Sequence, residues 1–387
     1  MTEAVIIAAG RTPIGRAFKG SLISARPDDM AAFVVRTLLD RLPELEPAEV
    51  DDVIIGAAVG DSEQGYNLGR AVSLLAGLPN SVPGATVNRM CASSLQAIRV
   101  AHHAIKAGEA RVVVAGGVES VTRTASVSFR AEDGNPRFTD PDREDFVSRY
   151  YLAMGLTAEN VADRYKVTRQ EMDAYAKLSQ DRAVAAQEAG GFDREIVPYL
   201  LPDGTLLARD DGPRPGTTLE ALAELKPAFR PDGRVTAGNA CPLNDGAAAV
   251  VITSDAHARE LGVRPLARIV CSAVSGIAPE IMGLGPIEAV RKALDLAGMS
   301  IRDIGVVELN EAFAAQVLPV CRELEIDIDC RLNPHGGAIA LGHPYGMTGA
   351  RLMTALLNDL SELDRRFGLV TMCVGGGQGM AMIVERL

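Results

Sequence analysis

Near its C-terminal end the chain carries the run Leu369-Val370-Thr371-Met372-Cys373-Val374-Gly375-Gly376-Gly377-Gln378-Gly379. A glycine tract after an apolar strand often cradles a phosphate, but this requires a helix N-terminus directly behind the glycines. The residues that follow, 380–387, are β-compatible, so we predict a strand, a glycine turn and a second strand. The glycines would expose backbone N–H groups beside the sulfur of Cys373, which suits an oxyanion; a buried structural cysteine in a glycine-rich hairpin is the alternative.

Similar apolar runs recur along the chain and alternate with helical patterns. They lie at 53–55, 111–115, 248–252, 306–307 and 369–371. Their hydrophobicity is continuous instead of alternating, which is typical of strands covered by helices on both faces. We therefore predict an α/β fold.

The two ends of the chain repeat one order of elements. Residues 51–55 precede Cys91 by about forty positions, and residues 303–307 precede His343 by nearly the same distance. An Ala-rich helix and another strand follow in each case. Such a pseudo-repeat would bring equivalent loops together at one central cleft.

The residues between the two halves are more polar and lack the alternation of apolar strands and helices, which indicates an insertion. A capping box at 168–171 opens a helix that two glycines end at 190–191. We predict a first half formed by 1–118 with 247–265, an inserted loop and lid domain at 119–246, and a second half at 266–387.

Composition excludes several classes of protein. The formal net charge of −11 argues against a nucleic-acid partner and against attraction to an anionic membrane, so an anionic substrate would need a local basic patch. Six dispersed cysteines without a C-x-x-C pair argue against a zinc site and a disulfide framework. Neither a signal peptide nor a transmembrane run is evident, so we expect a cytoplasmic protein.

Three more polar residues lie at the ends of predicted elements. Cys91 precedes a helix, whose N-terminal dipole would lower the pKa of the thiol and favour a nucleophile; a small residue in a tight turn is the alternative. His343 lies among glycines, where its ring could approach a substrate, although isolated histidines are more often structural. Asn310 ends a strand and could hold a water, donate to an oxyanion or cap a helix.

At these positions the chain resembles the thiolase family over essentially its whole length. The motifs that carry the resemblance are 9–15 at the start, Cys91-Ala92-Ser93-Ser94-Leu95-Gln96-Ala97, Asn310-Glu311-Ala312-Phe313, Gly342-His343-Pro344 and 373–379. The resemblance implies a thiolase-like fold, with two pseudo-repeated halves in five α-β-α-β-α layers and an inserted lid domain.

The resemblance also implies a role for each polar residue. Cys91 would carry the acyl group, His343 would take its proton, and Cys373 would act as acid and base at the α-carbon. His343 and a water held by Asn310 would form one oxyanion hole, and the N–H groups of Cys91 and Gly375 the other. Coenzyme A and acyl-CoA would be substrates, without a metal or a permanently bound cofactor, in a homodimer or homotetramer.

By the same matching, Arg214 would lie near the nucleotide phosphate of coenzyme A, with a solvated loop arginine as the alternative, and Cys241 would lie beside the pantetheine. The residues expected to line the thioester pocket are Met154, Phe229, Met282 and Phe313. Without the family resemblance, we would expect these four apolar side chains to lie in the hydrophobic core.

Three departures from the family pattern bear on the substrate. Ser94 replaces a usual glycine, Cys241 replaces a serine, and Ala153 replaces the histidine of short-chain biosynthetic members. The loss of that histidine favours 3-ketoacyl chains longer than acetoacetyl, which would be cleaved by thiolysis or formed by the reverse Claisen condensation. An acetoacetyl-CoA-forming enzyme is the alternative; a decarboxylating condensing enzyme or a non-catalytic lipid-binding relative fits the motifs less well.

Overall fold

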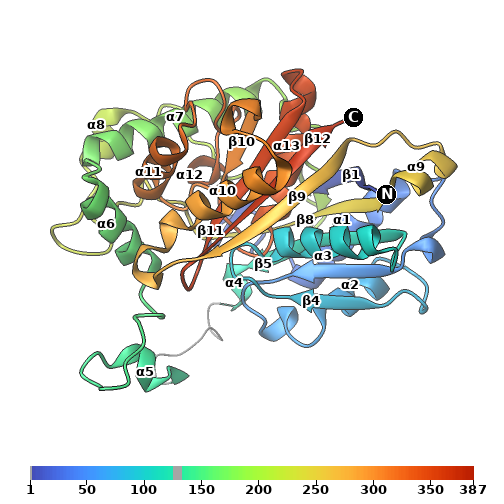
Figure 1. Cartoon of the computed structure of the whole chain (residues 1–387), viewed down its shortest axis with the longest axis horizontal. Helices are drawn as coiled ribbons and strands as arrows, with labels where there is room; N and C mark the ends of the chain where they lie inside the picture. The colour runs from blue at the N-terminus through green and yellow to red at the C-terminus, as the bar shows by residue number, and fades with distance from the viewer. Residues whose placement is uncertain (1, 125–132) are drawn as a thin grey trace.

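A computed structural model describes residues 2–124 and 133–387, and its main feature is one mixed β-sheet that crosses the whole molecule (Figure 1). Its strands are β1 (Ala4–Arg11), β2 (Gly15–Arg16), β3 (Asp52–Gly56), β4 (Gly84–Val87), β5 (Val112–Ser120), β8 (Asn244–Ser254), β9 (Ala267–Gly276), β10 (Val306–Leu309), β11 (Phe367–Val374) and β12 (Gln378–Arg386). A separate ribbon pairs β6 (Tyr199–Leu200) with β7 (Leu206–Leu207).

Helices cover both faces of the sheet. The α-helices are α1 (Pro27–Asp40), α2 (Leu68–Leu75), α3 (Ser93–Ala107), α4 (Val121–Thr124), α5 (Pro136–Thr139), α6 (Met154–Tyr165), α7 (Arg169–Glu188), α8 (Leu219–Ala223), α9 (Asp255–Leu261), α10 (Gly285–Ala297), α11 (Ala314–Leu324), α12 (Ala338–Leu341) and α13 (Thr348–Glu362).

The sheet is built from two halves with the same topology, which confirms the predicted repeat. The strand order is β10-β11-β12-β9-β1-β8-β5-β3-β4, with β2 attached to β8. In each half a parallel pair, β3 with β5 or β10 with β11, is followed by an antiparallel strand, β8 or β12. The halves meet where β1 pairs antiparallel with β9.

Five layers result from this arrangement, as the resemblance implied. Helices α1 and α2 pack on the outer face of the first half, and α10 packs on the outer face of the second half. Helices α3 and α13 pack against each other between the two sheet halves. Because α13 is covered on all sides, nearly every residue from Thr348 to Leu360 is buried.

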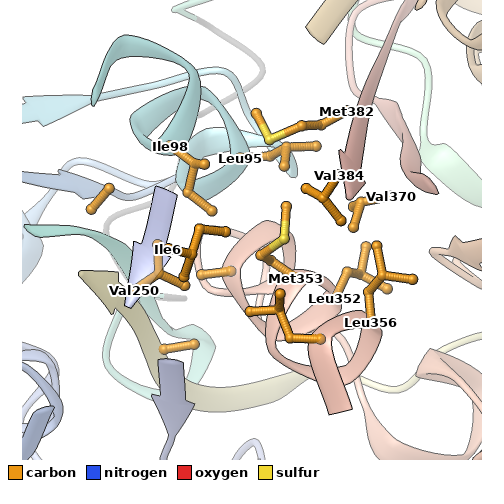
Figure 2. Packing of buried hydrophobic residues seen from close by; sticks show 14 of the residues in the cluster. Ile6, Leu95, Ile98, Val250, Leu352, Met353, Leu356, Val370, Met382 and Val384 are labelled. Carbon is orange, nitrogen blue, oxygen red and sulfur yellow. The ribbon is translucent and has the colours of Figure 1, made fainter. Parts of the chain in front are cut away.

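The central layer holds the main hydrophobic core (Figure 2). Its side chains come from α3, α13 and the facing strands, and they include Ile6, Leu95, Ile98, Val250, Leu352, Met353, Leu356, Val370, Met382 and Val384. Each fully buried aliphatic side chain contributes about 1.5–3 kcal/mol. The core therefore fixes α3 and α13, the helices that follow Cys91 and His343.

Two local predictions are confirmed. The glycine tract joins β11 to β12 in an antiparallel hairpin in which Cys373 lies opposite Gly379. Helix α7 begins with the predicted capping box, since Glu171 N–H donates to Thr168 Oγ1 at 3.2 Å and Thr168 N–H donates to Glu171 Oε2 at 2.7 Å.

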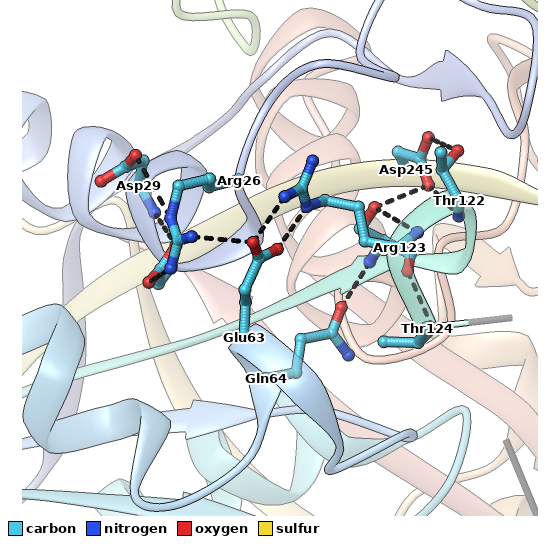
Figure 3. Close-up of polar contacts among 10 residues, drawn as sticks. Arg26, Asp29, Glu63, Gln64, Thr122, Arg123, Thr124 and Asp245 are labelled. Atoms are coloured by element: carbon cyan, nitrogen blue, oxygen red, sulfur yellow. Dashed lines mark hydrogen bonds and ion pairs between the residues drawn. The ribbon is translucent and has the colours of Figure 1, made fainter. Parts of the chain in front are cut away.

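Polar contacts tie together the two ends of the middle segment (Figure 3). Strand β5 ends at Ser120 and β8 begins at Asn244. The carboxylate of Asp245 accepts hydrogen bonds from the Thr122 N–H at 3.0 Å and from the Ser120 hydroxyl at 3.2 Å. The division into 1–118 with 247–265, 119–246 and 266–387 stays a prediction, and residues 125–132 lie outside the described part of the chain.

Within residues 2–124 and 133–387, no helix combines the length and the apolar character needed to cross a membrane.

Candidate active site

Cys91 lies in a tight turn immediately before α3. Met90 has a left-handed backbone (φ 46°), and the Ser93 hydroxyl closes the turn by donating to the Met90 carbonyl at 2.6 Å and accepting from the Arg89 N–H at 3.0 Å. Cys91 as a residue is half-buried. The backbone N–H of Gly375 from the glycine tract faces the sulfur.

The expectation that the helix N-terminus lowers the pKa of Cys91 is wrong. Burial raises the pKa of this thiol to about 12, and the nearby Cys373 adds to the increase, although the Gly375 N–H acts in the opposite direction. Loss of hydration is the largest cause, and α3 begins only at Ser93, two residues beyond the thiol. Cys91 therefore needs a base to become a nucleophile.

His343 lies in the loop between α12 and α13. The preceding Gly342 has φ 114°, and a Cβ atom there would lie 2.5 Å from the Asn244 side chain, so only glycine fits. The His343 N–H donates to Asn244 Oδ1 at 3.0 Å. These contacts hold the loop against β8 of the first half.

The hydrogen bonds of His343 determine its tautomer. Nδ1 lies 2.6 Å from the hydroxyl of Thr348, and that hydroxyl donates its own hydrogen to the Pro344 carbonyl at 2.8 Å. Because the hydroxyl has one hydrogen, it must accept from Nδ1–H, which leaves the lone pair on Nε2. Burial, with a further effect of Arg351, lowers the pKa of His343 to about 3, so the ring is a neutral base.

This pKa predicts the pH dependence of catalysis. A depressed pKa means that Nε2 keeps its lone pair as the pH falls through the ordinary histidine range near 6.5, so kcat/KM should show no acid limb there. We expect a flat kcat/KM between about pH 5.5 and 7.5 in initial-rate assays. As a control for irreversible inactivation, enzyme incubated at each pH is returned to pH 7.5 and its activity is measured again. An acid limb with a pKa near 6.5 would contradict the assignment.

Asn310 connects the histidine to the second half of the sheet. Its backbone N–H donates to the Thr371 carbonyl at 3.0 Å, and its Nδ2 lies 3.4 Å from Nε2 of His343. Its Oδ1 is buried and accepts no hydrogen bond from any residue that the structure describes. A buried acceptor of this kind is suited to holding a water.

Cys373 lies at the end of β11 and is buried. Nε2 of Gln316 on α11 donates to its sulfur at 2.7 Å. Burial raises the pKa of Cys373 to about 11, and the Gln316 hydrogen bond acts against this increase. In the turn that follows, Gly377 has φ 84° and a Cβ atom there would lie 2.2 Å from the Ile277 carbonyl, so a side chain is excluded.

The fold thus gathers the predicted polar residues from both halves into one cluster. Cys91 and Cys373 are close enough for each charge to affect the other, and Cys241 lies near both. Cys241 is held by its N–H, which donates to the Ala312 carbonyl at 2.9 Å. His343 lies beside Tyr345, with ring centroids 5.2 Å apart, and the charges of Cys91 and Cys241 act on that tyrosine.

The predicted pocket residues form an apolar wall beside this cluster. Phe229 and Phe313 meet edge to face, with ring centroids 6.0 Å apart. A Cβ atom on Gly155 would lie 2.2 Å from Phe229, which places this ring over the first turn of α6, where Met154 begins the helix. Met282 is buried in the same hydrophobic cluster as Phe313, whereas Phe229 is 41% exposed.

Arg214 is an exposed residue on a loop. Its backbone N–H donates to Gln180 Oε1 at 2.9 Å, and its guanidinium pairs with no carboxylate among the described residues. Burial and the nearby Arg16 lower the pKa of Arg214. These two arginines form a local positive patch; the sequence alone did not indicate Arg16, because it joins Arg214 only through folding.

The sequence did not indicate several residues whose side chains hold the backbone around the site in place. The carboxylate of Glu119 on β5 accepts hydrogen bonds from the N–H groups of Ala58 at 2.9 Å and Gly346 at 2.8 Å, and so clamps the histidine loop to the first half. The Ser94 hydroxyl accepts from the Ala350 N–H at 2.9 Å, which gives this departure from the family pattern a structural use. Nothing in the sequence indicated a role for Gln316 except its position shortly after the motif that begins at Asn310.

Comparisons with known proteins agree over the full chain. The family described as "Thiolase, N-terminal domain" matches residues 4–256, and "Thiolase, C-terminal domain" matches residues 263–386. The chain is 47% identical to the 3-oxoadipyl-CoA/3-oxo-5,6-dehydrosuberyl-CoA thiolase of Escherichia coli and 45% identical to a beta-ketoadipyl-CoA thiolase of Acinetobacter baylyi, each over the whole of both chains.

Two further relatives are named for activities other than cleavage of a ketoadipyl thioester. The 3-ketoacyl-CoA thiolase of Bacillus subtilis is 44% identical over the whole of both chains. The crystal structure of the Bacillus anthracis acetyl-CoA acetyltransferase superposes with a TM-score of 0.89 at 40% identity, covering 100% of this chain and 99% of that one.

Proposed function

This chain belongs to the thiolase family of acyltransferases, and from that premise we propose that it cleaves 3-ketoacyl-CoA thioesters with free coenzyme A through an acyl-enzyme at Cys91. The observation that carries the proposal is the cluster of two thiols, one neutral imidazole and a glycine backbone N–H, drawn from both halves of the fold. Each group has a separate task in a thiolytic cleavage.

In the first half-reaction the Cys91 sulfur bonds to the C3 carbonyl carbon while its proton passes to Nε2 of His343. The C2–C3 bond then breaks, and its electron pair forms the enolate of acetyl-CoA. Cys373 protonates the enolate carbon and becomes a thiolate. In the second half-reaction coenzyme A gives its proton to Cys373 and attacks the Cys91 thioester; Cys91 leaves and regains its proton from His343.

Two groups of hydrogen-bond donors would stabilise the negative oxygens of these steps. The N–H groups of Cys91 and Gly375 would face the oxyanion of the tetrahedral intermediate. The protonated Nε2 of His343 and a water on Asn310 Oδ1 would face the enolate oxygen. The unpartnered Oδ1, within the part of the chain that the structure describes, supports the placement of this water.

The phosphates of coenzyme A would lie near Arg214 and Arg16, and its pantetheine would pass Cys241. The acyl chain would lie against the apolar wall formed by Phe313, Met282, Met154 and Phe229. The positive patch supplies the local attraction that the net charge of −11 otherwise opposes. We further infer a cytoplasmic homodimer or homotetramer, as in the family resemblance.

The relatives' names and the missing histidine at Ala153 favour an acyl chain longer than acetoacetyl. The A. baylyi relative is named for a six-carbon 3-oxo dicarboxylic thioester, and the E. coli relative is named for one of six and one of eight carbons. We therefore expect kcat/KM to be at least about tenfold higher for 3-oxoadipyl-CoA or 3-oxohexanoyl-CoA than for acetoacetyl-CoA, since buried methylenes are worth about 0.8 kcal/mol each.

A thiolysis series in chain length, followed by loss of the 3-ketoacyl-CoA absorbance, measures this preference. The 3-oxohexanoyl thioester is the matched control for the terminal carboxylate of 3-oxoadipyl-CoA. A kcat/KM that is by far highest for acetoacetyl-CoA would instead support the alternative, an acetyl-CoA acetyltransferase, which the likeness to the B. anthracis enzyme also favours.

A further inference from the structure

We propose that Gln316 is a positioning residue for Cys373, whose side-chain N–H orients the sulfur and stabilises the thiolate that forms during α-proton transfer. This inference rests on the proposed thiolase reaction. Gln316 lies three residues beyond the motif Asn310-Glu311-Ala312-Phe313.

The side chain of Gln316 is oriented so that its amide N–H donates to the sulfur of Cys373. It lies in the first turn of α11, is 1% exposed, and directs Nε2 at the Cys373 sulfur at 2.7 Å. Its Oε1 is buried and finds no donor within residues 2–124 and 133–387. Among those residues, the sulfur of Cys373 is therefore the hydrogen-bond partner of the Gln316 side chain that anchors the orientation of its amide.

The backbone around Gln316 leaves it little freedom. A Cβ atom on Gly283 would lie 2.7 Å from both Cβ and Oε1 of Gln316, so the amide packs directly against this glycine. The helix itself is anchored at its start, where the Ala314 N–H donates to the Asn239 carbonyl at 2.9 Å. The donor is therefore held in place before the substrate arrives.

The two thiols have different donors. The Gly375 N–H faces Cys91, whereas the Gln316 side chain faces Cys373. In cleavage, Cys373 gives its proton to the enolate carbon; in condensation, the Cys373 thiolate removes a proton from the methyl group of acetyl-CoA, the C–H electron pair forms the enolate, and S–H forms. The negative charge on Cys373 thus arises in both directions, and Gln316 is the group directed at it.

Other titratable groups surround this sulfur. Cys91 and Cys241 lie close enough for the charge of Cys373 to raise the pKa of both thiols. His343 lies behind Asn310 and becomes cationic only after it takes the Cys91 proton. Gln316 donates to the sulfur throughout the cycle because its amide does not titrate.

The test is exchange of deuterium from trideuteroacetyl-CoA into water by the full-length enzyme, measured between pH 6 and 9. Gln316→Met keeps the shape of the side chain and removes the donor; we expect exchange at pH 7.5 to fall about 10- to 100-fold, as for a hydrogen bond to a charged group. The pH profile should also move to higher pH, because loss of the donor disfavours the thiolate.

Gln316→Glu is the second variant, because it matches the native shape and replaces the donor with an acceptor. Its exchange should be slower than that of Gln316→Met at the upper end of the pH range, where its carboxylate repels the thiolate. Both variants should retain the amplitude of acetylation at Cys91, measured by intact mass. Cys321→Ala, a buried substitution on the same helix, should exchange at the wild-type rate.

Exchange within about twofold of wild type in Gln316→Met, or, if that variant does not fold, in Gln316→Glu, would overturn the proposal. A slow exchange with an unmoved pH profile and a reduced acetylation amplitude would also overturn it, because it indicates a purely structural role. A wild-type enzyme that neither thiolyses nor exchanges would instead refute the proposed function.

Discussion

Replacement of Cys91 by serine should lower kcat for thiolysis by about a thousandfold or more. Serine keeps the size of the side chain, but its hydroxyl is a far weaker nucleophile than a thiol that His343 deprotonates. Steady-state thiolysis with 3-oxoadipyl-CoA and coenzyme A measures the loss. The acyl-enzyme mass found after wild-type protein is mixed with acyl-CoA should be absent from the variant.

The structure offers a matched control for this experiment. Cys271 is also half-buried and free, but it lies on β9, where its thiol donates to the Ala293 carbonyl at 3.2 Å. Cys271→Ser should therefore keep full turnover. Unchanged thiolysis in Cys91→Ser would exclude an acyl-enzyme at this residue and with it the proposed mechanism.

Replacement of Cys373 by alanine should separate the two chemical steps. The variant should still be acetylated at Cys91, because His343 and the Gly375 N–H remain. It should lose α-proton exchange and condensation by about a thousandfold or more, because the substitution removes the thiol proposed to move the α-proton. Intact mass reports the acetyl group, and deuterium exchange from trideuteroacetyl-CoA reports the proton transfer.

The outcome also tests the glycine tract. Cys373→Ala removes the sulfur but leaves the backbone of β11 and the turn unchanged, so acetylation should keep the oxyanion contact of Gly375. Full condensation in this variant would show that another group moves the proton. A variant that is neither acetylated nor active would show that Cys373 is needed for the first step as well.

Much of the fold could be predicted because local patterns determine it. The hairpin at 367–386 and helix α7 follow from glycine turns, apolar runs and a capping box, which act over a few residues. The repeated order of elements predicted the two halves. The sequence also indicated Cys91, His343 and Cys373 as candidates, since each lies at the end of an element.

The chemistry of those residues depends on contacts that no local pattern contains. The sequence suggested an acidic thiol at Cys91, whereas burial raises the pKa of that thiol to about 12. Arg351 acts on His343 across the start of α13, and Gln316 reaches Cys373 over 57 positions of sequence.

The sequence alone thus determined the strand–turn–strand at Cys373, the covered sheets and the positions of the reactive side chains, because hydrogen bonding and periodicity act between near neighbours. Only the tertiary structure decided which side chain donates to each thiol, which nitrogen of His343 is free, and how strongly each group holds its proton. Those properties depend on loss of water and on groups from distant segments, which come together only when the two halves pack on α3 and α13.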